Sequence, residues 1–113
     1  MDCIFCAIAK GEIPSKTVYE DDLIKAFYDI NPQTPVHVVI IPKIHIASAN
    51  EVDEKSADYI AHIFKMIPKI AKDLGVDKDG YRIINNCGKF AGQTVNHIHF
   101  HLLGGADLGE RLV

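Results

Sequence analysis

The chain has 113 residues, a formal net charge of −3, a hydrophobic fraction of 48% and a charged fraction of 24%. This length and composition are typical of one globular domain, spanning residues 1–113, with its own hydrophobic core. The small negative charge gives no support for binding to nucleic acid or to an anionic membrane surface. The longest aliphatic run, residues 38–41, is far too short to span a bilayer.

Three cysteines are an odd number for a disulfide framework, and two of them, Cys3 and Cys6, form a C-x-x-C pair. The chain opens with Met-Asp-Cys and not with a basic segment followed by a long apolar stretch. Together these features predict a reduced, cytoplasmic protein without a membrane partner.

The first half of the chain predicts a short helix and three strands. Residues 3–10 are apolar at mixed spacing and predict the short helix. Residues 17–19 and 23–28 predict two strands joined by an acidic turn. Two prolines mark residues 31–35 as a loop, and the β-branched residues 36–41 then predict a third strand.

The second half predicts one long helix, residues 53–74, and two further strands. The apolar residues with helical spacing are Val52, Ala57, Ile60, Phe64, Ile67, Ile70, Ala71 and Leu74. Pro68 falls inside this pattern and predicts a kink or a break, because proline removes one amide donor. Residues 81–85 predict a strand, residues 88–93 a glycine-bearing loop, and residues 94–103 the last strand. The result is an α+β domain.

Three histidines occupy every second position of the last predicted strand, at His97, His99 and His101. In a strand all three imidazoles leave the same face, while the large apolar residues between them point into the core. A single histidine on a strand is usually structural. Three adjacent imidazoles competing for protons add nothing to a sheet, so the pattern predicts proton transfer, metal binding or attack on phosphorus.

The segment before these histidines combines flexibility with polar donors. Its glycines allow backbone amides to turn toward an anion, and Asn86, Gln93 and Thr94 add neutral donors. An ordinary glycine hairpin loop has the same composition. Beside three histidines, the segment predicts a phosphate contact.

Three more histidines and one aspartate are weaker candidates. His37 lies on the strand predicted over residues 36–41 and could pack against the histidine strand. His45 follows residues 36–41 and could be a surface residue. Asp29 could hold a ligand hydroxyl or simply cap a loop. His62, in the middle of the long helix, predicts a surface or partly buried residue without a chemical role.

Cys3 and Cys6 supply half of a tetrahedral zinc site, and the two missing ligands could be histidines. The alternatives are a pair of free, partly buried thiols and a redox pair, although no thioredoxin-like pattern surrounds them. Cys87 predicts an unpaired loop thiol.

Taken together, these motifs resemble the histidine triad (HIT) family over nearly the whole chain, and most closely its Hint-like branch of purine nucleoside phosphoramidases. The matching segments are His97-Ile98-His99-Phe100-His101-Leu102-Leu103, Gly92-Gln93-Thr94, residues 81–86, residues 36–45, Ile4-Phe5, Gly11-Glu12-Ile13-Pro14 and Tyr28-Asp29-Ile30-Asn31-Pro32. The resemblance implies a HIT-like antiparallel sheet of about five strands, with one long helix and a short N-terminal helix. It also implies a homodimer.

The resemblance further implies hydrolysis of a purine nucleoside 5′-phosphoramidate through a nucleotidyl-histidine intermediate, without a cofactor for catalysis. His99 is the implied nucleophile, and His101 contacts the phosphoryl oxygens or passes a proton to the leaving amine. His37 belongs to the same chain of imidazoles. The implied nucleotide-binding residues are Ile4, Phe5, Ile8, Phe27, Asp29, Ile30, Asn86, Gly92, Gln93, Thr94, His99 and His101.

Many bacterial proteins resembling this chain hold a structural zinc ion, and the matching ligands here are Cys3, Cys6, His45 and His97. Two features depart from the branch: Thr94 replaces a common serine, and the C-terminal tail lacks a common tryptophan. Three rival functions stay open. These are a hydrolase whose histidines hold a catalytic zinc, a non-enzymatic nucleotide-binding scaffold, and a hydrolase of other nucleotide conjugates such as dinucleoside polyphosphates.

Overall fold

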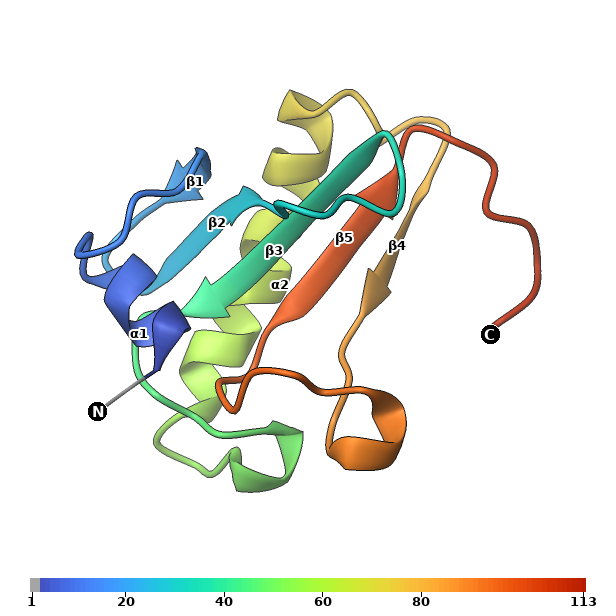
Figure 1. Ribbon diagram of the computed structural model, residues 1–113. Helices are drawn as coiled ribbons and strands as arrows, with labels where there is room; N and C mark the ends of the chain where they lie inside the picture. The colour runs from blue at the N-terminus through green and yellow to red at the C-terminus, as the bar shows by residue number, and fades with distance from the viewer. Residues whose placement is uncertain (1–2) are drawn as a thin grey trace.

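The computed structural model describes residues 3–113 and shows one antiparallel sheet with a helix against each face (Figure 1). Met1 and Asp2, which entered the prediction of a chain without a signal segment, lie outside the described residues. The strand order is β1-β2-β3-β5-β4. The elements are α1 (Ile4–Ala9), β1 (Thr17–Glu20), β2 (Ile24–Tyr28), β3 (Val36–Pro42), α2 (Ala57–Asp73), β4 (Tyr81–Ile84) and β5 (Phe100–Gly104). The α+β prediction is confirmed.

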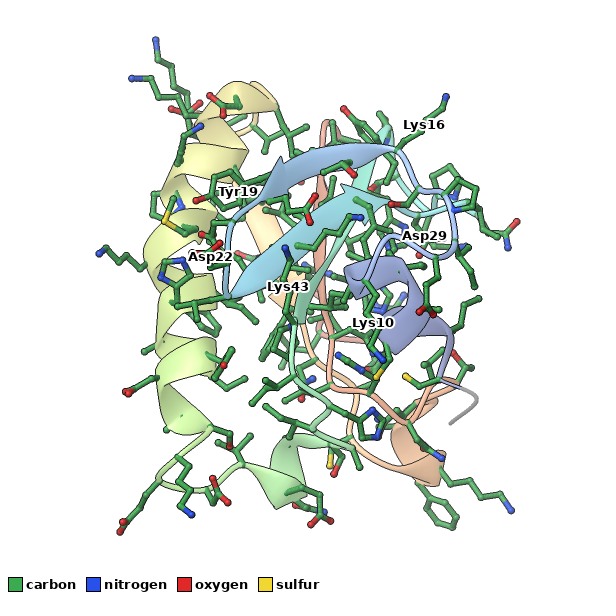
Figure 2. The ribbon with its side chains drawn as sticks, turned by 90° about the vertical axis from the view of Figure 1, so that its left-hand side faces the viewer. Lys10, Lys16, Tyr19, Asp22, Asp29 and Lys43 are labelled. Carbon is green, nitrogen blue, oxygen red and sulfur yellow. The ribbon has the colours of Figure 1, made fainter. Side chains whose placement is uncertain are left out.

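The two faces of the sheet bury different side chains, as the period of two along a strand requires. In β2, Ile24 and Ala26 belong to the main core beneath α2, whereas Phe27 belongs to a smaller cluster beneath α1. Figure 2 views the molecule toward edge strand β1 and shows the two helices on opposite sides of the sheet. The main core therefore lies under α2, and the α1 side is left for the site described below.

Helix α1 has only six residues, and its packing holds it on the sheet. Its buried residue Ile8 joins Phe27, Val39 and Ile41 in the smaller cluster. The ammonium group of the buried Lys25 donates a hydrogen bond to the Ile8 carbonyl at 3.0 Å. A cation at the end of a helix satisfies carbonyls that have no helical partner, so Lys25 anchors the C-terminal end of α1.

Helix α2 begins four residues later than predicted. The carboxylate of Asp53 accepts hydrogen bonds from the backbone amides of Lys55 and Ser56, which makes a turn ahead of the helix. The apolar residues from which the helix was predicted left out Ile63, which is fully buried, and included Phe64, which is 49% exposed. The buried residues of the helix are Ile63, Ile67, Ile70 and Ala71.

The helix runs through Pro68 without interruption, so the predicted break is wrong. A proline inside a helix costs about 3 kcal/mol. Burying one isoleucine side chain contributes roughly 1.5 to 3 kcal/mol. Ile67 and Ile70 flank Pro68 and are both buried, and their burial offsets the cost of the proline.

The last strand is shorter than predicted, and this places two of the three histidines outside it. Pairing between β3 and β5 ends at Ile40 and Phe100. The ladder stops because Pro42 has no amide to donate, and the Ile98 amide instead donates to the Ile46 carbonyl at 2.6 Å. Among residues 3–113, no helix is both long enough and apolar enough to cross a membrane.

Candidate active site and metal cluster

The alternation of side chains expected for His97, His99 and His101 survives although the first two precede β5. The intervening Ile98 and Phe100 belong to the main core. Phe5 of α1 contacts the imidazoles from the other side, with ring centroids 5.9 Å from His97 and 5.0 Å from His99. The histidines therefore face α1.

Backbone carbonyls determine which ring nitrogen carries the proton in two of these histidines, since a carbonyl can only accept. His97 Nε2 lies 3.0 Å from the Pro42 carbonyl oxygen, and His99 Nδ1 lies 2.8 Å from the His97 carbonyl oxygen. Each of these nitrogens must be the N–H donor. In a neutral ring the lone pair is then on the opposite nitrogen, which is Nδ1 in His97 and Nε2 in His99.

His37 on β3 pairs with His101 on β5, as the sequence predicted. His37 Nε2 and His101 Nδ1 are 2.9 Å apart, and the ring of His101 is also 5.2 Å from that of His99. Burial lowers the pKa of both His37 and His101 below the usual histidine value. Both imidazoles are therefore neutral near pH 7.

Asp29 follows β2 and approaches this pair of imidazoles. Its Oδ2 lies 3.5 Å from His37 Nε2, while its Oδ1 accepts the Asn31 amide at 2.8 Å. The negative charge of Asp29 raises the pKa of His37, but burial is the larger effect and the pKa is lowered overall. Asp29 thus combines a loop cap with a position beside the histidines.

A cavity of about 1000 Å³ opens between α1 and the loop that follows β2. The predicted nucleotide-binding residues in its wall are Ile4, Phe5, Ile8, Phe27, Asp29, Ile30 and Thr94. His37 also lines it, and Ile30 is 92% exposed at its mouth. His99 and His101 lie behind this wall, in contact with Phe5 and His37 respectively. The cavity and these two histidines are therefore neighbours: His99 and His101 do not line the cavity, but they contact residues that do.

The loop after β4 carries several of the predicted nucleotide-binding residues. The Gln93 side-chain amide donates to the carbonyls of Ala47 and Val95, and its oxygen accepts the Gly88 amide. Both amide hydrogens donate to backbone carbonyls, one in the segment after β3 and one in the same loop, so this side chain holds the loop in place and its ligand contact stays a prediction. Gly92 adopts a φ of 84°, which favours glycine at this turn. Asn86 is partly buried.

Two residues that hold the histidines in place were missed by the sequence reasoning. The Asn85 side chain donates to the His99 carbonyl at 2.9 Å, and the backbone amide of Gln33 donates to His37 Nδ1 at 3.0 Å. Asn85 belongs to the Asn-Asn pair at the end of β4, and two polar side chains at a strand end were a signal from which this hydrogen bond could have been predicted. The Gln33 amide had none, because every residue except proline carries the same group.

The four predicted metal ligands, Cys3, Cys6, His45 and His97, converge with all donor atoms within 4.8 Å of one another. Sulfur-to-nitrogen distances are 3.4 Å from Cys3 to His97, 3.5 Å from Cys6 to His97 and 3.3 Å from Cys6 to His45. In a zinc tetrahedron with ordinary bond lengths, sulfur and nitrogen ligands are about 3.6 Å apart. The donor set fits a zinc ion.

The orientation of His97 also suits this cluster to a cation. The bond from His97 Nε2 to the Pro42 carbonyl directs the lone pair of Nδ1 toward the thiols, which is how metal-ligating histidines are oriented. Burial, followed by the adjacent Cys3, raises the pKa of the Cys6 thiol. A bound cation would favour both sulfurs as thiolates.

Other candidate groups lie away from this site or make no contact with it. His62 Nε2 is 2.6 Å from Asp21 Oδ2 and links α2 to the turn between β1 and β2, which is a structural role. Cys87 is a free thiol. Within residues 3–113, His97, His99 and His101 do not converge as a metal-ligating group.

The sequence and the fold both have close relatives. Residues 10–108 match the HIT domain family. The chain is 46% identical to the "Purine nucleoside phosphoramidase" of Escherichia coli strain K12, over 98% of this chain and 93% of the relative. A histidine triad protein from Clostridium difficile has a TM-score of 0.94 and 50% identity, covering 98% of this chain and 96% of its own.

A second solved structure, a HIT family hydrolase from Clostridium thermocellum, has a TM-score of 0.96 and 52% identity, with coverage of 99% of this chain and 97% of its own. The alternating histidines, their position on the face toward α1 and these full-length similarities agree with one another. The chain belongs to the HIT domain family.

Proposed function

We propose that this protein hydrolyses purine nucleoside 5′-phosphoramidates to a nucleoside monophosphate and an amine. The observation that carries the proposal is the 2.8 Å contact of His99 Nδ1 with the His97 carbonyl oxygen, which in a neutral ring places the proton on Nδ1 and the lone pair on Nε2. A neutral imidazole is a good nucleophile near pH 7. The similarity to the E. coli protein of that name supports the choice of substrate.

The reaction proceeds in two displacements at phosphorus. In the first, His99 Nε2 forms a bond to phosphorus, the phosphorus–nitrogen bond breaks, and the amine leaves with a proton. In the second, water attacks the same phosphorus and gives a proton to His101, the bond to His99 breaks, and the monophosphate is released. Splitting one difficult displacement into two lowers each barrier.

Other groups of the site supply the proton and balance the charge on phosphorus. His101 is neighbour to His99, with ring centroids 5.2 Å apart, and is the proposed donor to the leaving amine or the phosphoryl oxygens. Asn86 and Thr94 are the proposed polar contacts to those oxygens, and Gly92 allows their loop to turn. Such preorganised donors stabilise developing negative charge.

The cavity suits a nucleoside. Much of its wall is apolar, as a flat purine requires, and Asp29 in the same wall is the proposed acceptor of hydrogen bonds from the ribose hydroxyls. The proposed purine contacts are Ile4, Phe5, Ile8, Phe27 and Ile30.

We propose that Cys3, Cys6, His45 and His97 hold a structural zinc ion. The ion would crosslink α1 to the segments that follow β3 and precede β5, and no catalytic step passes through it. Metal binding of this kind contributes directly to folding free energy.

We further propose a cytoplasmic homodimer that uses neither nucleic acid nor membrane as a partner. Strand β4 is an edge strand of the sheet, and an open edge can pair with a second chain. The unpaired cysteines support a reducing compartment.

The test is mass spectrometry after rapid mixing with adenosine 5′-phosphoramidate, which should reveal an AMP adduct on His99 and released AMP. His99→Ala should abolish both, whereas His62→Ala, a histidine outside the site, should change neither. Turnover by His99→Ala at the parent rate would disprove the covalent route. Nucleotide binding without any AMP release would favour the scaffold function, and faster cleavage of a dinucleoside polyphosphate would favour that substrate class.

A further inference from the structure

We propose that the backbone N–H of Gln33 is a positioning group that fixes the protons on His37 and His101, so that His101 presents an Nε2–H donor to the reacting phosphoryl group. The chemical meaning of this inference rests on the proposed function. The proton positions themselves follow from geometry alone.

The first link is the contact between the Gln33 amide and His37. The amide nitrogen lies 3.0 Å from His37 Nδ1. A backbone amide can only donate, so His37 Nδ1 must carry a lone pair. A neutral imidazole holds one ring proton, which therefore lies on His37 Nε2.

The second link is the contact between His37 and His101. His37 Nε2, now the donor, lies 2.9 Å from His101 Nδ1. His101 Nδ1 must accept, since two N–H groups cannot face each other at this distance. The single ring proton of His101 is left on Nε2, the nitrogen directed away from His37.

His99 has the opposite arrangement, because the His97 carbonyl requires its proton on Nδ1. Two neighbouring imidazoles, with ring centroids 5.2 Å apart, therefore differ in what their Nε2 atoms offer. A neutral His99 offers a lone pair at this atom, and His101 offers a proton. Transfer of a phosphoryl group away from an amine needs both: a nucleophile that attacks phosphorus and a neighbouring donor that protonates the amine.

The same geometry opposes a second proton on either ring. On His37 the extra proton would point at the Gln33 N–H, and on His101 it would point at the His37 N–H. The charged and titratable groups that face the pair are Asp29 after β2 and His99 before β5. Asp29 favours protonation and His99 opposes it. Burial is the largest effect and lowers the pKa of both rings, in agreement with the geometry.

The loop that carries Gln33 is itself held in place. Asp29 Oδ1 accepts the Asn31 amide at 2.8 Å, and the Thr34 hydroxyl donates to the Val36 carbonyl at 2.6 Å. By contrast, the hydrogen bond that the Gln33 side chain makes within residues 3–113 is an exposed one to the Asn31 carbonyl, at 3.2 Å. The backbone amide and the side chain can therefore be separated by substitution.

The direct test is ¹⁵N NMR of the histidine rings in the unliganded parent protein. We expect an unprotonated Nδ1 and a protonated Nε2 at both His37 and His101, and the reverse at His99. A coupling across the hydrogen bond between the Gln33 amide and His37 Nδ1 should also be observed. A protonated Nδ1 on His37 near pH 7 would overturn the inference, whatever the activity of the protein.

A matched pair of variants tests the consequence. Gln33→Pro removes the amide hydrogen, and Gln33→Ala keeps it while removing the side-chain bond. Loss of correctly placed acid catalysis costs about 10²-fold or more, so we expect Gln33→Pro to lose about 10²-fold in kcat. Its ring nitrogens should lose the single tautomer, and its pH–rate profile should change. Gln33→Ala should keep the kcat, profile and tautomers of the parent.

Equal losses in both variants would assign the effect to the side chain, and unchanged kcat and tautomers in Gln33→Pro would remove any role for the amide. Both results contradict the inference. If Gln33→Pro does not fold, the ring spectra of the parent and of Gln33→Ala decide. Failure of the parent to release AMP would refute the proposed function separately, because the spectra do not depend on substrate.

Discussion

Phe5 lies edge-on to His99, with ring centroids 5.0 Å apart, and its other neighbours are His97 at 5.9 Å and Phe27 at 5.8 Å. It therefore packs between the cysteine–histidine cluster and the proposed nucleophile. Helix α1, which carries Phe5, has six residues and is capped by Cys3. A helix this short is unstable alone. The position of Phe5 in the cavity wall therefore depends on the contacts that Cys3 and Cys6 make in the cluster.

Removing the proposed zinc site should consequently weaken nucleoside binding more than it slows chemistry. In the Cys3→Ser/Cys6→Ser double variant we expect a lower Tm and a KM for adenosine 5′-phosphoramidate raised about tenfold. That increase corresponds to roughly 1.4 kcal/mol, close to the contribution of one buried apolar side chain. Metal content by mass spectrometry, thermal unfolding and calorimetric binding of AMP provide the measurements.

Cys87→Ser is the control for loss of a thiol outside the cluster, and it should match the parent in all three measurements. A parent protein purified without any zinc, or a double variant with unchanged AMP affinity, would contradict this link between cluster and cavity.

Asp29→Asn should raise the KM for a ribonucleoside phosphoramidate by about tenfold or more, since hydrogen bonds to charged groups contribute roughly 1.5 to 3 kcal/mol. The asparagine still offers an oxygen to the Asn31 amide. A 2′,3′-dideoxy substrate, which has no ribose hydroxyls, should show a much smaller change. Steady-state kinetics with both substrates measure the difference, and equal effects on the two would argue against ribose recognition. Asp22→Asn, an exposed carboxylate (Figure 2), is the control.

The free energy of unfolding should fall as the pH is lowered from about 7 to 5. The pKa of His37 and of His101 is depressed in the folded state by burial. Below the unfolded value of about 6.5, the unfolded chain binds protons that the folded chain excludes, so stability decreases with falling pH. The depressed pKa values of Glu20, Asp21 and Asp53 act at lower pH, because carboxylates titrate there.

Urea unfolding at several pH values measures this slope. The double variant His37→Asn/His101→Asn keeps the cysteine–histidine cluster, so any pH dependence of that cluster cancels in the comparison with the parent. Its slope between pH 7 and 5 should be smaller. Identical slopes would show that neither imidazole is kept neutral by the fold.

Pro68→Ala should stabilise the protein by about 2 kcal/mol. It restores a helical hydrogen bond and removes a cost of about 3 kcal/mol, less roughly 0.4 to 1 kcal/mol for the more flexible unfolded chain. Pro68 is exposed and lies outside the site, so kcat should not change. Urea unfolding compares it with Lys65→Ala, an exposed position of the same helix, and equal effects of the two would show that the proline costs nothing there.

Local patterns in the sequence determined the elements of this fold and the face on which the histidines lie. The alternation around His99 and the β-branched run of β3 require only the period of a strand, and α2 requires only helical spacing. These patterns record only which residues are apolar and not which residues they contact. They therefore included the exposed Phe64 in the apolar stripe of the helix and began the last strand too early. The C-x-x-C pair likewise indicated a metal without naming its remaining ligands.

Tertiary structure decided how the similar imidazoles differ from one another. The Pro42 carbonyl orients His97, the His97 carbonyl orients His99, and the Gln33 amide orients His37. Backbone groups are the same in almost every residue, so no sequence pattern records which of them meets a given side chain. The alternation of histidines in the sequence was enough to predict that their imidazoles share one face. Only the folded backbone determined which nitrogen holds a proton and which holds a lone pair.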